Sequence, residues 1–385
     1  MRILISTTRG AGHFGPLIPF AHAFLRNDDE LLVVAAASVA PMIERAGLDH
    51  WPFTDPPDEP RDAIFAEVRG MADGQGIAER VVADVFARID ARNAFPAVRN
   101  AIEAWRPDVV IYESTEFAAP LAAELAGVPA VRVNVFMTGE DVVMDVAADA
   151  LDELRAELDL PPDPGAERLR TGPTFTRGPA ALEYGDPAHV QRFRAPTPAP
   201  RLLPDWWRQA DWPLVYLTFG SVAPTSEFFP ELYRAAIDAL AVLPVRVLVT
   251  VGNERDPADL GPLPPNVHVA RWLPQADVMP HAAAVVSHGG SGTVQGALAH
   301  GVPMANLPLF ADQPYNARRI EELGAGIAVE EPERLTRAVA RLLDDPRYRA
   351  AARAIADEIE ELPPVDAVVG IVDEFVAYNQ PRSVA

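Results

Sequence analysis

Residues 284–293 read Ala-Val-Val-Ser-His-Gly-Gly-Ser-Gly-Thr, and this stretch decides the fold of the second half of the chain. The apolar run at 283–286 is typical of a buried strand. A helical pattern follows the glycines and ends at residues 301–303, Gly-Val-Pro. A glycine-rich turn between a strand and a helix exposes N–H groups at the positive end of the helix dipole, where phosphate commonly binds. The alternative is a tight turn capped by Ser291 that binds nothing.

Two pairs of residues flank this turn. Trp272 and Gln275 precede it, and Asp312 and Gln313 follow one predicted strand later. A tryptophan ring can stack on a flat base, a glutamine amide can bond to its edge, and an Asp-Gln pair can bind sugar hydroxyls. The chain thus offers groups for a base, a diphosphate and a sugar in that order, and a nucleotide sugar has those three parts.

Length and composition limit the classes of protein to consider. A chain of 385 residues suits two domains of ordinary size, and 49% hydrophobic with 23% charged residues fits a soluble globular enzyme. The net charge of −22 argues against nucleic acid or an anionic membrane as a partner. The chain has no cysteine, which excludes disulfides, thiolate catalysis and cysteine-bound zinc. It shows no signal-peptide pattern and no apolar run of membrane-spanning length, so we expect a cytoplasmic protein.

Strand and helix patterns alternate in the first half of the chain, which predicts a parallel, doubly wound α/β sheet. The strand at residues 2–6 is followed by a polar turn at 7–15 that contains His13. Ligands of such sheets bind beyond the carboxyl ends of the strands, where His13 is expected. His13 is either a helix-start residue that bonds locally or a catalytic base, because the unperturbed pKa of histidine suits a base near neutrality.

Glu113 is expected at the same edge of the sheet, because it ends the predicted strand at 109–113. A carboxylate that accepts a hydrogen bond from the far imidazole nitrogen fixes the tautomer and stabilises the imidazolium. Ser114 or Thr115 could orient the histidine instead. A solvated turn with no role in catalysis is the remaining alternative.

Composition also indicates where the chain divides. Four prolines between residues 196 and 204 predict an interdomain linker at 196–212, between domains at 1–195 and 213–364. Residues 56–76 are rich in Pro, Asp and Gly and are expected to form a mobile loop. Leu182–Tyr184 is expected to be the last strand of the first domain.

These motifs together resemble a known enzyme family. Val267–Ala328 resembles the donor-binding signature of family 1 glycosyltransferases, and Gly12–Pro19 resembles their N-terminal Gly-His motif. The resemblance covers nearly the whole chain and is greatest to the actinobacterial branch that glycosylates antibiotics and other natural products. It implies the GT-B fold, with two Rossmann-like domains facing across a cleft and a C-terminal helix, here residues 365–385, that packs back onto the first domain.

The resemblance implies roles for the residues of these motifs. His13 would be the catalytic base, supported by Glu113, where the family frequently has Asp. The family's acceptor pocket is walled by the region around residues 76–105, and the candidates here are Phe65, Met71, Phe86 and Phe136. The donor would bind residues of the second domain: Gly220, Ser221, Trp272, Leu273, Gln275, His288, Gly289, Gly290, Ser291, Gly292, Thr293, Asp312 and Gln313.

The implied reaction is inverting transfer, in which the base deprotonates an acceptor hydroxyl as it attacks the anomeric carbon. The family context favours a dTDP-deoxysugar donor and an apolar, polyketide-like acceptor, with UDP-glucose as the alternative donor. It implies no metal, no permanently bound cofactor, and a monomer or homodimer. A GT-B epimerase or hydrolase would lack the Gly-His and Trp-Leu-Pro-Gln motifs, and an inactive homologue that activates a partner protein would have damaged catalytic positions. Both motifs are present, and His13, His288, Asp312 and Gln313 are intact.

Overall fold

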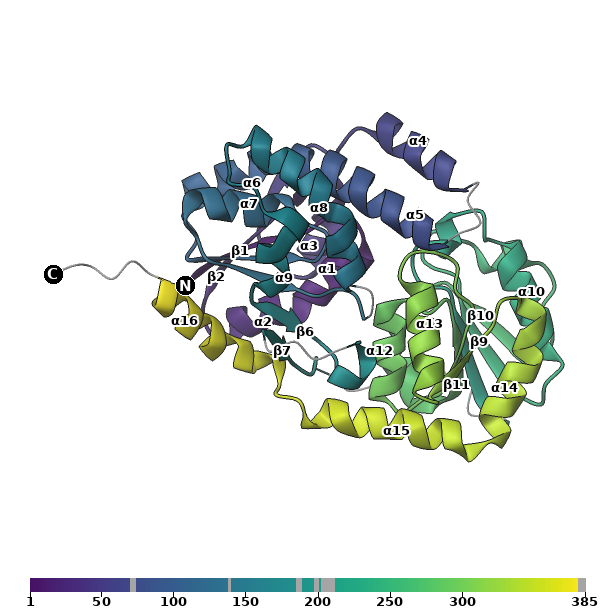
Figure 1. Ribbon diagram of the computed structural model, residues 1–385. Helices are drawn as coiled ribbons and strands as arrows, with labels where there is room; N and C mark the ends of the chain where they lie inside the picture. The colour runs from purple at the N-terminus through teal and green to yellow at the C-terminus, as the bar shows by residue number, and fades with distance from the viewer. Residues whose placement is uncertain (70–73, 138–139, 185–188, 197–200, 202–211, 380–385) are drawn as a thin grey trace. The chain divides into compact units, whose positions relative to one another are not determined.

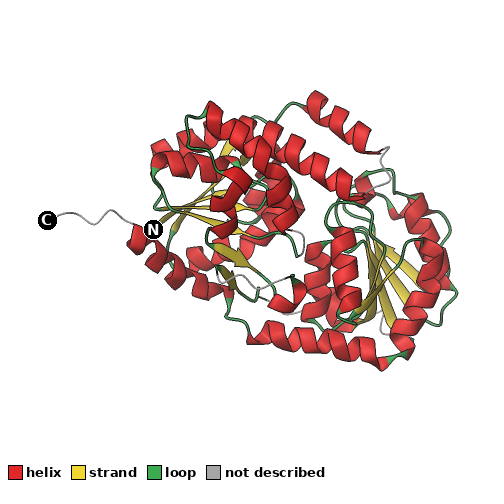
Figure 2. Ribbon diagram, viewed as in Figure 1, coloured by secondary structure: helices red, strands yellow, loops and turns green. Residues whose placement is uncertain are grey.

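The computed structural model describes residues 1–69, 74–137, 140–184, 189–196, 201 and 212–379. The chain forms two compact units. The first comprises Met1–Gly178, Gly185–Pro196 and Pro363–Ala385, and the second comprises Pro179–Tyr184 and Thr197–Leu362. Each unit contains a sheet with helices packed against it (Figure 2). The predicted linker at 196–212 falls almost entirely outside the described residues.

The sheet of the first unit has the order β3-β2-β1-β4-β5-β6-β7, and its neighbouring strands are all parallel. The strand order reverses between β1 and β4, and the crevice beyond such a reversal is where doubly wound sheets bind ligands. The strands are β1 (Arg2–Ser6), β2 (Glu30–Ala36), β3 (His50–Phe53), β4 (Val109–Glu113), β5 (Ala130–Val133), β6 (Thr174–Thr176) and β7 (Val190–Arg192).

Helices bury both faces of this sheet. Successive residues of a strand point to opposite faces, so each strand contributes to two core clusters. Leu4 joins a core cluster with α6 (Ala91–Trp105), α7 (Ala118–Ala126) and α8 (Glu140–Glu157). Ile3 and Ile5 join a second cluster with α2 (Ile18–Arg26), α3 (Ala40–Arg45) and the C-terminal helix α16 (Val368–Asn379). The last helix of the chain is therefore part of the core of the first unit.

Most of the described residues of 56–76 are helical, although their composition predicted a mobile loop. Helix α4 occupies Asp58–Arg69, and α5 occupies Gly74–Arg80. Pro60 lies in the first turn of α4, where proline is tolerated, and the acidic first turn suits the helix dipole. Val81–Asp90 (η3) then forms a π-helix ahead of α6, and π-helical turns frequently occur at functional sites.

The second unit contains a parallel six-stranded sheet of order β10-β9-β8-β11-β12-β13. Helices α12 (Ser291–Ala299) and α13 (Gln313–Glu322) cover one face, and α10 (Glu231–Ala241) and α14 (Leu335–Asp344) cover the other (Figure 1). The strands are β8 (Leu214–Thr218), β9 (Arg246–Thr250), β10 (Val267–Ala270), β11 (Ala282–Ser287), β12 (Met304–Asn306) and β13 (Gly326–Ala328). Helices α11 (Gln275–Val278) and α15 (Pro346–Glu361) also belong to this unit, whereas α1 (Ala11–Phe14) and α9 (Glu167–Thr171) belong to the first.

The strand predicted at Leu182–Tyr184 is wrong. Ala180–Leu182 is a short 3-10 helix that belongs to the second unit. Its Ala181 carbonyl accepts a hydrogen bond from Arg319 Nε rather than from a neighbouring strand. Among the described residues, none of the helices combines the length and apolarity needed to cross a membrane.

Candidate functional site

Two side chains meet at the β1/β4 reversal in the first unit. His13 lies on the short helix after β1, and Glu113 is the last residue of β4. Nδ1 of His13 is 3.3 Å from Oε2 of Glu113. With its proton on Nδ1, facing the carboxylate, the imidazole presents Nε2 as its basic nitrogen.

The Glu113 carboxylate is fully buried and held by four donors from two residues. Thr8 donates its backbone N–H (3.2 Å) and its hydroxyl (2.6 Å), both to Oε1. Thr115 donates its backbone N–H (2.8 Å), and its hydroxyl lies 3.0 Å from both carboxylate oxygens and 3.1 Å from His13 Nδ1. Burial alone would raise the pKa of Glu113, but His13 and these donors hold that pKa below its ordinary value. Glu113 is thus a fixed anion beside the imidazole.

Two of the three residues predicted to orient the histidine contact its ring. Both Glu113 and Thr115 contact His13 Nδ1, whereas the Ser114 hydroxyl donates to Val133 O and Asn134 Oδ1. Of the aromatic acceptor candidates, Phe86 packs its ring against His13 with 5.4 Å between ring centroids. Phe86 reaches this position from the π-helix η3.

The other acceptor candidates are less directly placed. Phe136 packs against the same core cluster as Phe86. Phe65 is half-buried on α4. Met71 lies outside the described residues.

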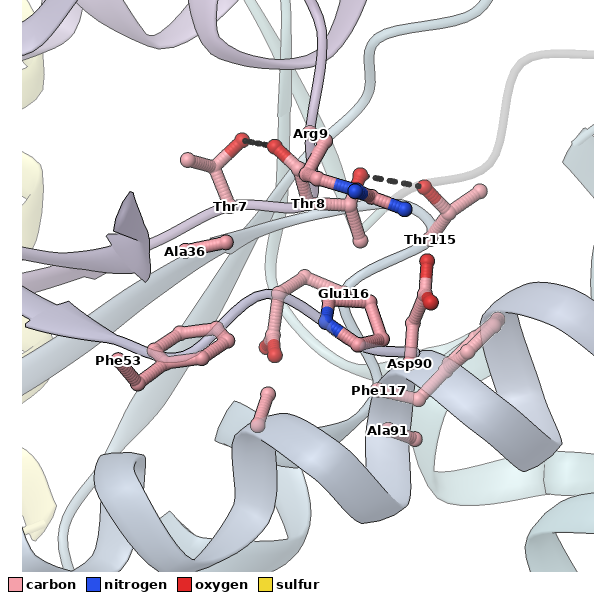
Figure 3. A pocket seen from close by; sticks show the side chains of 12 residues that line it. Thr7, Thr8, Arg9, Ala36, Phe53, Asp90, Ala91, Thr115, Glu116 and Phe117 are labelled. Atoms are coloured by element: carbon pink, nitrogen blue, oxygen red, sulfur yellow. Dashed lines mark hydrogen bonds between the residues drawn. The ribbon is translucent and has the colours of Figure 1, made fainter. Parts of the chain in front are cut away.

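A small pocket of about 20 Å³, enough for about one water molecule, lies beside the residues that hold Glu113, beyond the carboxyl ends of β1 to β4 (Figure 3). Thr8 and Thr115, which hold Glu113, are part of its wall. In Figure 3 the Asp90 carboxyl group lies on the side of Arg9, and that of Glu116 lies on the side of Phe53. The lining residues are Thr7, Thr8, Arg9, Ala36, Phe53, Pro56, Asp90, Ala91, Ala94, Thr115, Glu116 and Phe117.

Two buried acids of this pocket have raised pKa values. Burial raises the pKa of Asp90 to about 6, although Arg61 opposes the shift through a 3.0 Å ion pair. Burial raises the pKa of Glu116 to about 8, although the Ala119 N–H donates to its Oε2 at 2.8 Å and favours the charged form. Glu116 is therefore largely protonated at neutral pH, whereas Glu113 is charged.

The glycine-rich turn of the second unit lies between β11 and α12. Ser287 pairs with Thr218 in the sheet, which brings this turn beside the Gly220-Ser221 turn that follows β8. The N–H groups of Thr293 and Val294 donate to the Gly290 carbonyl, and no side chain caps α12, so the N–H groups that precede them lie at the positive end of its dipole. Ser291 does not cap this helix: the cap residue is Gly290, and the Ser291 hydroxyl donates to Asp312 Oδ2 at 2.6 Å.

His288 fills the space between these two turns. A Cβ atom added at Gly220 would lie 2.7 Å from His288 Nε2, and one at Gly290 would lie closer still. Gly220 also has a φ of +76°, which disfavours any side chain. His288 Nδ1 is buried without a hydrogen-bond partner among the described residues, and burial lowers the pKa of His288 to about 4. The imidazole is therefore neutral, and the Nε2–H tautomer leaves no buried donor unpaired.

Asp312 and Gln313 adjoin the same turn at the start of α13. Gln313 Oε1 accepts from the backbone N–H groups of Leu309 (2.8 Å) and Phe310 (3.0 Å). The Asn316 amide nitrogen lies 2.7 Å from Asp312 Oδ2 and 2.9 Å from the Gly289 carbonyl. This arrangement joins Asp312, a predicted sugar-binding residue, to the glycine-rich turn.

The remaining donor candidates differ in how exposed they are. Trp272 is 58% exposed, and Leu273 is half-buried beside it. Gln275 starts α11 and donates from Nε2 to the Thr293 hydroxyl at 3.1 Å, which links the predicted base-binding segment to α12. Ser221 and Gly292 are exposed.

Sequence reasoning missed five residues of these sites. Thr8, Arg9, Asp90 and Glu116 surround the Glu113 carboxylate or the pocket, and Asn316 supports the glycine turn. A signal existed for Thr8, which is a hydroxyl residue in the turn after β1. No cluster of three or more His, Asp or Glu side chains that could hold a metal ion occurs in the part of the chain that the structure describes.

Family models match both halves of the chain. The N-terminal domain of erythromycin biosynthesis protein CIII-like proteins matches residues 22–211, and the C-terminal domain matches residues 234–375. L-Demethylnoviosyl transferase of Streptomyces niveus is 32% identical over 93% of this chain and 94% of its own length. The 4'-demethylrebeccamycin synthase of Lentzea aerocolonigenes is 31% identical over 97% of this chain and 98% of its own length.

A solved structure shares the whole architecture. The Streptomyces sp. SF2575 glycosyltransferase SsfS6, complexed with thymidine diphosphate, is 25% identical to this chain. The match has a TM-score of 0.78 and covers 97% of this chain and 99% of the other. The likeness therefore extends over both units.

Proposed function

The chain belongs to the erythromycin biosynthesis protein CIII-like family of GT-B glycosyltransferases, and from that premise we propose an inverting transfer of a sugar from a dTDP-sugar to a hydroxyl of an apolar, polyketide-like aglycone. The family transfers sugars to natural-product aglycones. The donor, the stereochemistry and the base are our proposal. UDP-glucose remains the alternative donor.

The contact between His13 and Glu113 is the observation that carries the proposal. The buried carboxylate keeps the proton on Nδ1, so Nε2 takes the proton of the acceptor hydroxyl as that hydroxyl attacks the anomeric carbon. The imidazolium that forms is stabilised by the neighbouring anion. Phe86, whose ring packs against His13, would contact the aglycone.

The second unit supplies the groups for the nucleotide sugar. Trp272 stacks on the base, and Gln275 contacts the base or the ribose. His288, Ser221 and the start of α12 bind the diphosphate, and Asp312 and Gln313 bind the sugar. Negative charge grows on the leaving diphosphate, so N–H groups at the helix N-terminus stabilise the transition state more than the ground state. Neutral His288 contributes a hydrogen bond rather than a charge.

The proposed reaction needs groups from both units. The acceptor oxygen must lie within hydrogen-bond reach of the base and within about 3–3.5 Å of the anomeric carbon that it attacks.

Thymidine diphosphate is the first nucleotide to test. It is bound in SsfS6, and a 27% identical relative from Streptomyces peucetius is named TDP-daunosamine transferase. We expect calorimetry to detect binding of thymidine diphosphate and Trp272→Ala to weaken it, since stacking on a base is worth about 1–3 kcal/mol, or roughly 5- to 150-fold in Kd. Trp212→Ala is the matched control, because Trp212 is similarly exposed, at 48%, and lies outside the donor motifs.

A product assay separates transfer from the other reactions of nucleotide sugars. The protein is incubated with a dTDP-deoxysugar, with and without a panel of polyketide alcohols, and products are identified by mass spectrometry and NMR. We expect a glycoside of inverted anomeric configuration that forms only with an acceptor. Equal release of dTDP in both arms, or a glycoside that retains the configuration, would contradict the proposal.

A further inference from the structure

The Asn316 side chain lies fully buried behind the glycine-rich turn of the second unit. Its amide nitrogen is 2.9 Å from the Gly289 carbonyl oxygen, 2.7 Å from Asp312 Oδ2 and 3.2 Å from Ser291 Oγ. An amide nitrogen carries two hydrogens, which the two shorter contacts use. The Ser291 hydroxyl already donates to Asp312, so it needs no hydrogen from Asn316.

We propose that Asn316 is a positioning residue of the donor site, which sets the glycine turn and the Asp312 carboxylate in fixed relation to each other. This inference rests on the proposed function, because it assigns Asn316 a task in binding the nucleotide sugar. Asn316 itself is buried and does not touch the substrate.

The first half of the task concerns the direction of a backbone N–H. The Ser287 hydroxyl accepts from the Gly289 N–H at 3.0 Å, and Asn316 donates to the Gly289 carbonyl, so both sides of this residue are fixed. Within one trans peptide unit the C=O and the next N–H point in opposite directions. A carbonyl held towards Asn316 therefore turns the Gly290 N–H away from the core, to the side where α12 begins and the diphosphate is proposed to bind.

The second half concerns the carboxylate of Asp312. Its Oδ2 accepts from both Ser291 and Asn316, and these two donors fix the rotation of the carboxylate. The sugar-binding group and the phosphate-binding turn thus share one amide. A change in that amide is expected to disturb both.

Two substitutions separate positioning from mere packing. Asn316→Asp keeps the shape of the side chain but puts an oxygen in place of the amide nitrogen. That oxygen faces the Gly289 carbonyl and the Asp312 carboxylate, and it cannot donate to them while it is ionised. At lower pH two neighbouring carboxylates share a proton, which restores a donor. Asn316→Ala removes the donor at every pH. The other titratable group on the turn, His288, has a pKa of about 4 and stays neutral from pH 5.5 to pH 8.

The matched control is Asn266→Asp. Like Asn316, Asn266 uses its amide nitrogen for two hydrogen bonds, here to the backbone carbonyls of Ala241 at 3.2 Å and Val245 at 2.9 Å. Asn266 lies just before β10, at the opposite end of the strands from the glycine turn. This variant loses the same kind of interaction in the same unit without touching the donor site.

The experiment measures the Kd of thymidine diphosphate by calorimetry for the wild type and the three variants at pH 5.5 and pH 8. We expect Asn316→Asp to weaken binding at least tenfold at pH 8, with at least threefold recovery relative to the wild type at pH 5.5. Asn316→Ala should weaken binding equally at both pH values, and Asn266→Asp should stay within twofold. Titration of the nucleotide itself cancels in these ratios.

Three results would overturn the inference. These are unchanged affinity in Asn316→Asp, a loss in Asn316→Asp without recovery at pH 5.5, and an equal loss in Asn266→Asp, which would indicate general loosening of the unit. A wild type that binds neither thymidine nor uridine diphosphate would instead refute the proposed donor site, and the inference with it.

Discussion

Nδ1 of His13 lies 3.3 Å from Oε2 of Glu113, and the carboxylate is fully buried while 21% of the histidine side chain is exposed. The pair thus has a dry anionic side and a side that solvent or substrate can reach. Thr8 and Thr115 saturate the carboxylate with hydrogen bonds, so it stays ionised and keeps its orientation. This is the arrangement that a histidine base requires.

Replacing Glu113 by Gln should nearly abolish transfer. The Gln amide would donate to Nδ1, which forces the proton onto Nε2 and removes the base. We expect kcat to fall on the order of 10²-fold or more, while the Kd of thymidine diphosphate is unchanged. Thr115→Val, which removes one hydroxyl from the same carboxylate, should cost about tenfold or less. Equal activity of Glu113→Gln and wild type would contradict the role of the carboxylate.

Glu116 should lower the free energy of unfolding as the pH rises. Its pKa is raised from 4.5 to about 8 in the folded protein, so between these values the folded state holds a proton that the unfolded chain releases. Stability from this group is full below about pH 4.5 and is lost as pH rises to 8 and above. Glu116→Gln should therefore exceed the wild type in the free energy of unfolding at pH 9 by more than at pH 5, measured with urea. A difference that is the same at both pH values would refute the raised pKa.

Two glycines of the same turn should respond oppositely to alanine. At Gly290 an added Cβ would collide with the His288 ring, whereas at Gly292 it would meet nothing within 4 Å. Gly292→Ala should raise the free energy of unfolding by about 0.5–1 kcal/mol, because alanine is the better helix former. Gly290→Ala should lower it and weaken nucleotide binding by displacing His288. Thermal unfolding of both variants checks the prediction, and a stable Gly290→Ala with wild-type affinity would contradict the packing of His288.

Chelation should leave the transfer rate unchanged. The proposed diphosphate site is built from N–H groups at the start of α12 and from neutral His288, which take the place of a cation. Transfer is measured before and after EDTA treatment, and again with added magnesium. Loss of activity with EDTA and its recovery with magnesium would show that a metal is required.

The sequence predicted that His13 and Glu113 share one edge of the sheet, because the carboxyl ends of parallel strands lie at the same edge. The structure adds that β1 and β4 are adjacent, which makes the two residues neighbours. The glycine turn was equally accessible, since strand, glycines and helix are continuous in the chain. Asn316 was not predictable in the same way, because its partners depend on side-chain directions after folding. A local pattern does not contain that information.

Composition misled at two places for identifiable reasons. Residues 56–76 contain prolines, but Pro60 falls in a first helical turn where it is tolerated, so α4 forms. The π-helix at Val81–Asp90 has no sequence signature distinct from that of an α-helix, yet it carries Phe86 to His13 and Asp90 to the pocket. Leu182–Tyr184 was predicted to be a strand, but the N–H groups of Leu182 and Glu183 donate to the Pro179 and Ala180 carbonyls in a 3-10 turn instead.

The central claim, that His13 is the base of a sugar transfer, is tested most directly by His13→Ala. The rate of transfer from a dTDP-sugar to an aliphatic alcohol acceptor is measured together with the Kd of thymidine diphosphate. His22→Ala is the control, because His22 lies on α2 and bonds to the Ala46 carbonyl at 2.9 Å, away from Glu113. We predict a fall in rate on the order of 10²–10⁴ for His13→Ala with unchanged nucleotide affinity, and near wild-type activity for His22→Ala. Transfer by His13→Ala at the wild-type rate would contradict the account.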